Sequence, residues 1–287
     1  MEEAFEAERS NLLGLAYRML GSRADAEDMV QETYVRVRRA AVAPDNVAGY
    51  LTRTCVRLCL DRLKSAQRRR EQYVGPWLPE PFLQDRAAAE QAEFDESLSL
   101  ALLTALECLS PAERAALLLH DVFDYGFDEV ASILGKSPVA CRQLATRARS
   151  RLRHRRVDAH VKTPQAEYEM VAKAFFAALR TGNLDDLKQT LAADVVLRSD
   201  GGGRVLAARR PVEGAAKVAL FLSRTIMAGP IPECELVHFN GLIGLVVREN
   251  MVPRAAFQVH VVHGRVSEIA VLRNPDKLDP FLGPRKR

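Results

Sequence analysis

Apolar residues recur at helical spacing through the first seventy residues, and two breaks divide this part into three predicted helices. The first helix carries an apolar stripe from Leu12 to Leu20 and is expected to end at Gly21-Ser22. Ser22 is a capping residue followed by early acids, which suits the start of a second helix. A third, long helix is predicted from Val47 to about Arg70.

Helical spacing returns between residues 98 and 157. Ser110-Pro111-Ala112-Glu113 combines a capping box with a proline in the first helical turn. Residues 128–156 then form two predicted helices with a tight turn at Gly135, and Ser137-Pro138 begins the second of them. This pattern is typical of a helix-turn-helix. An ordinary helical hairpin with a solvated basic face is the alternative.

The segment between these helical parts has the composition of a linker. Prolines and a glycine cluster between Gly75 and Pro81, and acid-rich sequence follows. The single tryptophan, Trp77, lies in this stretch. Prolines preorganise the chain and tryptophan is a strong interface anchor, so the stretch is either a docking motif or a spacer with one exposed aromatic residue.

After Pro164 the periodicity changes. Helices are predicted at about 166–181, 184–191 and 213–228, and one strand at 194–198. Four alternating strands follow at 235–240, 242–248, 255–262 and 266–272, with turn chemistry at Asn240-Gly241 and His263-Gly264. Helices first and an antiparallel meander last predict an α+β domain.

Composition narrows the class of protein. The 287 residues are 48% hydrophobic, which excludes a disordered chain. The sequence contains no apolar run of about 18 residues, so no membrane span is predicted. The acidic N-terminus lacks the apolar core of a secretory signal. Five cysteines without CxxC or zinc-site spacing favour reduced thiols in a cytoplasmic protein, with no metal and no cofactor.

The formal charge of +4 conceals a strong segregation. Residues 1–32 carry 8 acids and 3 bases, and residues 33–73 carry 10 bases and 3 acids. Residues 74–135 carry 12 acids and 2 bases, whereas residues 136–157 carry 8 bases and no acid. Two basic blocks between acidic ones indicate two polyanion contacts and at least one basic protein surface as partner.

The acid-free block coincides with the second helix of the predicted helix-turn-helix. Its side chains are donors that suit phosphates and base edges in a major groove. The candidate DNA-binding residues here are Lys136, Ser137, Arg142, Gln143, Thr146, Arg147 and Arg149. A second candidate set lies along the long third helix and comprises Arg53, Thr54, Arg57, Asp61, Arg62 and Lys64. Together the two sets indicate a protein that touches DNA at two places.

The first 157 residues resemble an extracytoplasmic-function sigma factor of bacterial RNA polymerase. Residues 25–35 are similar to the core-binding helix of that family, residues 47–70 to its −10-reading helix, and residues 106–156 to its −35-reading domain. Three further motifs resemble the signatures of a SigJ-like subgroup with a SnoaL-like C-terminal extension. They are Trp77, Leu78, Pro79, Glu80 and Pro81; Asp200, Gly201, Gly202, Gly203 and Arg204; and Asn274, Pro275, Asp276, Lys277 and Leu278. Arg204 stands where the subgroup commonly has lysine.

The resemblance implies a multidomain fold, in which two all-α sigma domains precede an α+β SnoaL-like cone of the cystatin and ketosteroid-isomerase type. The implied domains are region 2 at 1–73, a linker at 74–97, region 4 at 98–157 and a regulatory domain at 166–287. The implied partners are promoter DNA and the β and β′ subunits of core RNA polymerase. Asp25, Asp28, Gln31 and Glu32 are the expected polymerase-binding residues, although acids alone also simply solvate a helix N-terminus.

Three interpretations of the C-terminal domain stay open. SnoaL-like domains enclose a pocket, and some are enzymes; the acid–base candidates are Tyr168, Asp200, His238, His260 and His263. An unidentified small ligand is the second interpretation. The third, which we favour, is a non-enzymatic clamp in which the three motifs meet and modulate sigma activity in cis, with no separate anti-sigma factor. The rival functions are a ligand-binding or catalytic domain fused to a DNA-binding regulator, and a repressor with one operator.

Overall fold

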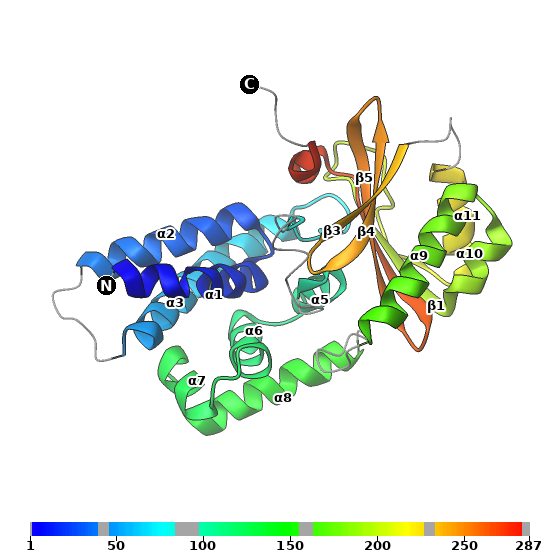
Figure 1. Cartoon of the computed structure of the whole chain (residues 1–287). Coiled ribbons are helices and arrows are strands. Elements are labelled where there is room, and N and C mark those ends of the chain that lie inside the picture. Colours follow the sequence, from blue (N-terminus) through cyan, green and yellow to red (C-terminus); the bar gives the residue numbers. More distant parts are fainter. Residues whose placement is uncertain (1, 40–45, 84–97, 155–162, 227–232, 283–287) are drawn as a thin grey trace. The chain divides into compact units, whose positions relative to one another are not determined.

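The computed structural model describes residues 2–39, 46–83, 98–154, 163–226 and 233–282 (Figure 1). The chain folds into two compact units. The first comprises Met1–Gln72 and Ala105–His160, and the second comprises Tyr73–Thr104 and Val161–Arg287. The described part of the predicted linker, with Tyr73 before it and residues 98–104 after it, therefore folds with the C-terminal residues. We call residues 73–104 as a whole the linker.

The first unit is helical throughout its described residues. Its elements, with α5 shared at the unit boundary, are α1 (Glu2–Leu20), α2 (Arg23–Arg39), α3 (Val47–Glu71), α5 (Leu100–Leu106), α6 (Pro111–Leu117), the π-helical turn η2 (Leu118–Val122), α7 (Phe127–Leu134) and α8 (Pro138–His154). Helix α1 packs against α2 and α3, and α6 packs against α8. The three predicted N-terminal helices are confirmed. No helix in the described ranges is long and apolar enough to cross a membrane.

Local sequence signals explain the boundaries of the helices in the second half of this unit. At α6, Glu113 N donates to Ser110 Oγ at 3.4 Å and Ser110 N donates to Glu113 Oε2 at 3.0 Å, which confirms the predicted capping box. Helix α7 ends at Gly135, whose φ of 63° lies in the left-handed region that favours glycine. The predicted turn between α7 and α8 is thus confirmed.

The two helical halves of the first unit contact each other directly. Helix α3 packs against α6 and α7. Arg114 of α6 is 1% exposed, and its guanidinium donates to Met19 O and to Leu106 O, both at 2.7 Å. Met19 O is one of the last carbonyls of α1, which have no partner within their own helix, so a cation from the other half satisfies it.

The second unit is built on one six-stranded sheet. Its strands are β1 (Leu191–Asp200), β2 (Val212–Glu213), β3 (Glu233–Phe239), β4 (Leu242–Glu249), β5 (Val252–Val262) and β6 (Arg265–Leu272), in the order β2-β1-β6-β5-β4-β3. Strands β3 to β6 form the predicted antiparallel meander, whereas β1 pairs parallel with β6. The remaining elements are α9 (Gln165–Thr181), α10 (Leu184–Thr190), α11 (Ala215–Ile226), α12 (Pro275–Leu278) and the short turn η3 (Asp279–Leu282).

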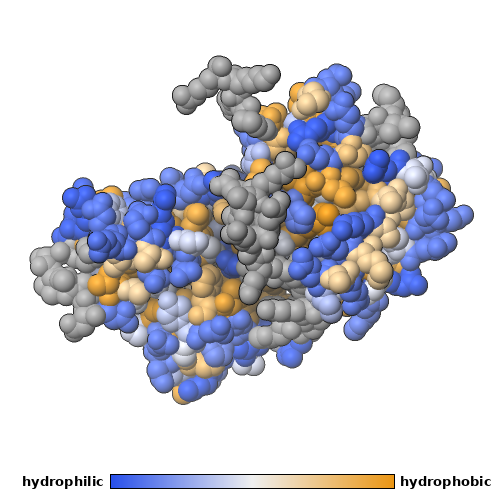
Figure 2. All heavy atoms as spheres, in the orientation of Figure 1, coloured by the Kyte–Doolittle hydropathy of each residue, from blue (hydrophilic) through white to orange (hydrophobic). Residues whose placement is uncertain are grey.

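The two faces of the sheet bury different partners. Helices α9, α10 and α11 cover one face with an apolar core that includes Phe175 and Phe257 (Figure 1). On the other face, Leu78 from the predicted linker and Leu100, the first residue of α5, are fully buried against strand residues such as Phe239 and against α12 and η3. Figure 2 shows hydrophobic residues gathered over the strands. Since the linker residues fill this second face, they are part of the domain core.

Candidate functional site

Helix α8 presents most of the candidate −35 residues to solvent. Lys136, Arg142, Gln143, Thr146 and Arg147 are exposed. Ser137 caps the helix, because its Oγ accepts from Ala140 N at 3.2 Å. The guanidinium of Arg142 lies 5.5 Å from the centre of the Phe127 ring. That contact orients a donor beside the beginning of the helix.

Two buried carboxylates hold the flanks of α8. Glu113 pairs with Arg151 at 2.6 Å and with Arg147 at 3.4 Å. Asp121, on the π-helical turn η2, accepts from Arg149 Nε at 2.8 Å and from Nη2 at 2.5 Å. Burial pushes the pKa of Glu113 up, but hydrogen bonds from Ser110 and the two arginines outweigh it, so the pKa is lowered overall. Arg149 is thus half-buried and held by two hydrogen bonds within the unit, whereas Arg147 pairs with Glu113 and stays exposed.

The candidate −10 residues on α3 are divided in their contacts. Thr54 Oγ1 donates to its own helix at Tyr50 O, 2.8 Å away, and Lys64 pairs with Asp61 at 3.0 Å. Arg57 is exposed. Arg62 lies on another side of the helix, where its guanidinium pairs with Asp25 of α2. One predicted DNA contact and one predicted polymerase contact therefore hold α2 and α3 together.

Arg53 also faces protein. Its Nη2 donates to Ser132 Oγ of α7 at 2.5 Å. One residue earlier, Thr52 Oγ1 lies 3.1 Å from Tyr125 Oη, in the turn before α7. Thr52 is 4% exposed. The side of α3 that carries a candidate −10 residue is in contact with the helix-turn-helix.

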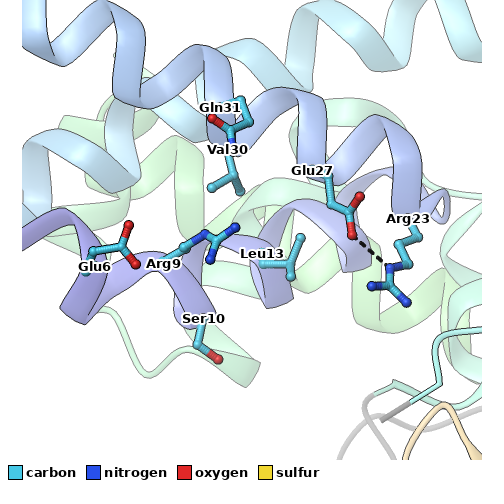
Figure 3. A pocket seen from close by; sticks show the side chains of 8 residues that line it. All are labelled: Glu6, Arg9, Ser10, Leu13, Arg23, Glu27, Val30 and Gln31. Atoms are coloured by element: carbon cyan, nitrogen blue, oxygen red, sulfur yellow. Dashed lines mark hydrogen bonds and ion pairs between the residues drawn. The ribbon is translucent and has the colours of Figure 1, made fainter. Parts of the chain in front are cut away.

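The candidate polymerase-binding residues of α2 lie beside a groove. Asp28 and Gln31 are exposed, and Glu32 pairs with Arg36 at 2.7 Å. The groove, of about 450 Å³, runs between α1 and α2 (Figure 3). Its lining residues are Glu6, Arg9, Ser10, Leu13, Arg23, Glu27, Val30 and Gln31. Of these, Gln31 is a predicted polymerase contact and Glu27 belongs to the predicted negative face of α2. The α1 side of the groove was not predicted, because the sequence pattern of α2 does not show which face of α1 lies beside it.

The three subgroup motifs come together around Asp200 in the second unit. Asp200 is 0% exposed, and its carboxylate accepts four hydrogen bonds. The donors are Tyr73 Oη at 2.7 Å, Leu78 N at 3.0 Å, Gly202 N at 3.0 Å and Lys277 Nζ at 2.8 Å. The Lys277 ammonium also donates to Leu78 O and lies 4.4 Å from the centre of the Trp77 ring. We call Tyr73, Trp77, Leu78, Asp200, Asn274 and Lys277 the Asp200 cluster.

Backbone hydrogen bonds and a close approach at Gly202 hold the residues of the Asp200 cluster together. Arg273 N and Asn274 N both donate to Asp200 O at 2.8 Å, and Asn274 Nδ2 donates to Tyr73 Oη at 2.9 Å. At Gly202, whose φ is +61°, a Cβ would lie 2.4 Å from Asn274 Nδ2, so the close approach requires glycine. Burial and the neighbouring Asp200 carboxylate raise the pKa of Tyr73. The phenol therefore stays a donor at neutral pH.

Arg204, the departure from the subgroup pattern, lies at the edge of this region. It pairs with Asp276 at 3.0 Å, and the two side chains are 62% and 55% exposed. An ion pair this exposed contributes little free energy, and it places no demand on the planar guanidinium that a lysine would fail to meet.

A second contact with the linker was not predicted. Asn240 Nδ2 donates to Leu98 O at 2.9 Å, and its Oδ1 accepts from Phe82 N at 2.9 Å. Gln258 Oε1 accepts from Leu100 N at 2.7 Å. In the sequence, Asn240 appeared only as a turn residue. The available signal was Gln258, a polar side chain flanked by the apolar residues Phe257 and Val259 of a strand.

The acid–base candidates are spread over the second unit. Tyr168 lies in the helix-covered core, where its hydroxyl donates to Ile243 O at 2.9 Å. Asp200 belongs to the Asp200 cluster. His238 is exposed on β3, His260 pairs across the sheet with Glu268, and His263 lies in the β5–β6 turn. Asp200 thus serves the contact with the linker, whereas Tyr168 lies in the helix-covered core.

Comparison with known proteins identifies the class. The family description "Sigma-70 region 2" matches residues 4–69, and "Sigma-70, region 4" matches residues 99–152. The ECF RNA polymerase sigma factor SigJ of Mycobacterium tuberculosis is 36% identical over 95% of this chain and 91% of its own length. A probable ECF sigma factor of the same species, SigI, is 33% identical over 97% of this chain and 94% of its own.

The chain belongs to the extracytoplasmic-function sigma factors of RNA polymerase. It is similar along its whole length to SigJ, whose crystal structure matches with a TM-score of 0.79 at 33% identity, covering 97% of this chain and 98% of that one. The predicted family, the sigma-factor function and the fold class of helical sigma domains followed by an α+β domain are confirmed.

Proposed function

We propose that the three candidate surfaces divide the work of initiation. Helix α8 with its flanking residues contacts the −35 element, α3 contacts the −10 element, and α2 with the groove beside α1 binds core polymerase through the β′ subunit, with β as a further contact. The exposed, acid-free face of α8 supports the first assignment. The acids of α2 support the third, because they suit a basic partner. We place this function in the cytoplasm, and we keep the domain limits 1–73, 98–157 and 166–287.

We further propose that the C-terminal domain regulates the sigma factor in cis by holding the linker. The observation that carries this proposal is the fully buried Asp200 carboxylate, which accepts from Tyr73 and Leu78 of the linker and from Lys277 of the domain's own last helix. A buried charge is tolerated only where it is fully paired. Moving the linker away would leave the Asp200 carboxylate without two of its donors, which would cost free energy.

The length of the linker makes this hold consequential. The 32 residues from Tyr73 to Thr104 could span about 105 Å if extended. Both ends are instead fixed to one sheet, at the Asp200 cluster and at Asn240 and Gln258. A held linker restricts how far the −10 and −35 readers can separate.

Contacts inside the first unit hold the candidate −10 helix against the helix-turn-helix, and we call this arrangement the closed state. Arg53, a candidate −10 residue, is bonded to Ser132 of the helix-turn-helix. A sigma factor must present both DNA-reading surfaces at once, so we propose that this arrangement is inactive and that releasing the linker opens it. A separate anti-sigma factor is then unnecessary.

The test is Lys277→Met, which leaves Asp200 buried without its cation and weakens the hold by about 3–5 kcal/mol. We expect a larger distance between fluorescent labels on α2 and α8, tighter binding to core polymerase and more run-off transcript. Trp77→Ala, which removes only the ring beside Lys277, should act in the same direction with less effect.

The matched control is Asp276→Asn in the same motif. Its exposed pair with Arg204 is worth about 0–1 kcal/mol, so the variant should behave like the wild type. An unchanged label distance in both Lys277→Met and Trp77→Ala, with the second unit still folded, would overturn the regulatory proposal.

A further inference from the structure

One apolar side chain interrupts the polar face of α8. Val139, the second residue of the helix, is 60% exposed. Among the described residues of the first unit, the only other large hydrophobic side chain counted as exposed is Val35, at 37%. Nothing in the fold of the unit requires valine at such a position, since it packs against no core.

The position of Val139 relative to the donors of α8 is specific. Residues at i, i+3, i+4 and i+7 share one face of a helix, so Val139 lies in one stripe with Arg142, Gln143 and Thr146. All four side chains are exposed. The stripe occupies the N-terminal half of the helix, and in helix-turn-helix proteins this half of the second helix contacts base edges.

Three ion pairs, made by two carboxylates, fix the direction in which the stripe points. Glu113 holds Arg147 and Arg151 on one flank of α8, and Asp121 holds Arg149 on the other. These pairs resist rotation of the helix about its own axis. A rotation of 20° would move side-chain ends by about 2 Å, enough to break a hydrogen bond to a base. The stripe is therefore presented in a fixed orientation.

We propose that Val139 is a specificity-determining residue, which packs against the 5-methyl group of a thymine in the −35 element. In the major groove this methyl group is the one apolar feature of the base edges, and apolar side chains recognise it. This inference rests on the proposed role of α8 in −35 recognition. It goes further by naming one residue of α8, Val139, and the base that this residue recognises.

The test uses holoenzyme assembled from core polymerase and the full-length chain. A −35 element is first selected from duplexes randomised over that region, and each thymine is then replaced singly by deoxyuridine, which lacks only the methyl group. We expect one replacement to weaken binding by wild-type holoenzyme about fourfold, the value of one buried methyl group. With Val139→Ala, whose one methyl group stays close to the backbone, the same replacement should have a clearly smaller effect, and at the other thymines both proteins should respond alike.

A second variant guards against a loss of fold. Val139→Thr keeps the branched shape but replaces a methyl group by a hydroxyl, so we expect it to reduce the preference for thymine over deoxyuridine at that one position. Equal sensitivity of wild type and both variants at every thymine would overturn the assignment. A selected element without any sensitive thymine would do the same.

Two further outcomes separate this inference from other possibilities. If Arg142→Ala weakens duplex binding while Val139→Ala leaves the deoxyuridine pattern unchanged, the role of α8 stands and the role of Val139 is wrong. If Arg142→Ala has no effect on the −35 duplex, the proposed role of α8 itself fails. A loss of affinity for core polymerase in Val139→Ala, with unchanged duplex preferences, would identify Val139 as a protein contact instead.

Discussion

The side chains of Asp200, Asp121 and Glu113 are buried carboxylates. Each forms an ion pair with a cation from a segment distant in sequence. Removing one partner from such a pair leaves a charge without solvent, which costs about 3–5 kcal/mol. Single residues therefore fix where a linker, a helix and a turn are placed.

His260 gives the second unit a pH-dependent stability. Burial lowers its pKa to about 4, whereas an unfolded histidine titrates near 6.5. Between these values the unfolded chain binds a proton that the folded chain does not. Stability is therefore complete above pH 6.5 and should fall by up to about 3 kcal/mol as the pH decreases to 4.

Denaturant unfolding followed by the fluorescence of Trp77 between pH 4 and 7.5 measures this loss. His260→Gln should flatten the profile. His238→Gln replaces an exposed histidine of the same unit and should keep the wild-type slope. A wild-type slope in His260→Gln would contradict the prediction.

Only some of the contacts of these single residues could be predicted from the sequence. It indicated the three motifs around Asp200, because their residues are unusual and carry a family resemblance. It did not indicate that Asp121 and Glu113 are buried, since an acid in a helical pattern looks the same whether it faces water or an arginine. The charge of Arg149 suggested a DNA contact for the same reason.

The elements depend on these residues for their orientation. Arg149 is bidentate to Asp121 on the π-helical turn η2, so we expect it to position α8 rather than contact phosphate. Arg149→Gln should weaken binding of the −35 duplex without changing its dependence on salt. Affinity measured between 50 and 200 mM salt distinguishes the two roles, because each lost phosphate contact reduces the slope by about one.

Lys136→Gln is the comparison for that measurement, because Lys136 is exposed just before α8 and should contact phosphate. We expect its slope to decrease by about one. A decrease of the same size in Arg149→Gln would assign Arg149 to the DNA contacts.

The capping box of α6 is a second test at the scale of elements. Ser110→Ala removes the acceptor for Glu113 N and should cost about 1 kcal/mol of unfolding free energy. Glu113→Ala should cost more, because Glu113 also pairs with Arg151 and Arg147. Equal losses in the two variants, measured by denaturant titration, would mean that the ion pairs contribute nothing.

Most elements could be predicted because their signals are local. Apolar spacing and caps gave α1 to α3, Ser110 gave α6, and the alternation of residues gave β3 to β6. Strand β2 has only two residues and shows no alternation. The π-helical turn η2 has the same apolar pattern as an α-helix, so its extra residue per turn leaves no trace in the sequence.

For the whole molecule, the meeting of the linker motif with the C-terminal motifs was expected, but the burial of linker residues in the core of the C-terminal unit was not. Leu78 and Leu100 are buried against Phe239 and Leu272, residues more than 130 positions away in the chain. The hydrophobic and polar pattern of a short stretch of sequence does not show which distant residues it will contact. The acidic, proline-rich composition left a docking motif and a spacer equally open, and the contacts made after folding distinguish the two.

Deleting residues 163–287 should expose the linker. Without the sheet, Leu78 and Leu100 lose their apolar partners and Tyr73 loses Asp200. Limited proteolysis should then cleave within residues 73–83 much faster than in the full chain, and promoter-dependent transcription with core polymerase should change. Equal cleavage rates in the two forms would show that the linker is protected without the C-terminal domain.

The order of the chain gives this arrangement a consequence during synthesis. Residues 73–104 leave the ribosome before the sheet that receives them exists. The second sigma region is complete only at residue 157, and at about 5–20 residues per second translation of the 130 residues that follow takes about 7–26 s. Each newly made molecule therefore passes through an interval in which both sigma regions are complete and the linker is still free, so the age of a molecule, as well as any signal, affects whether it can engage polymerase.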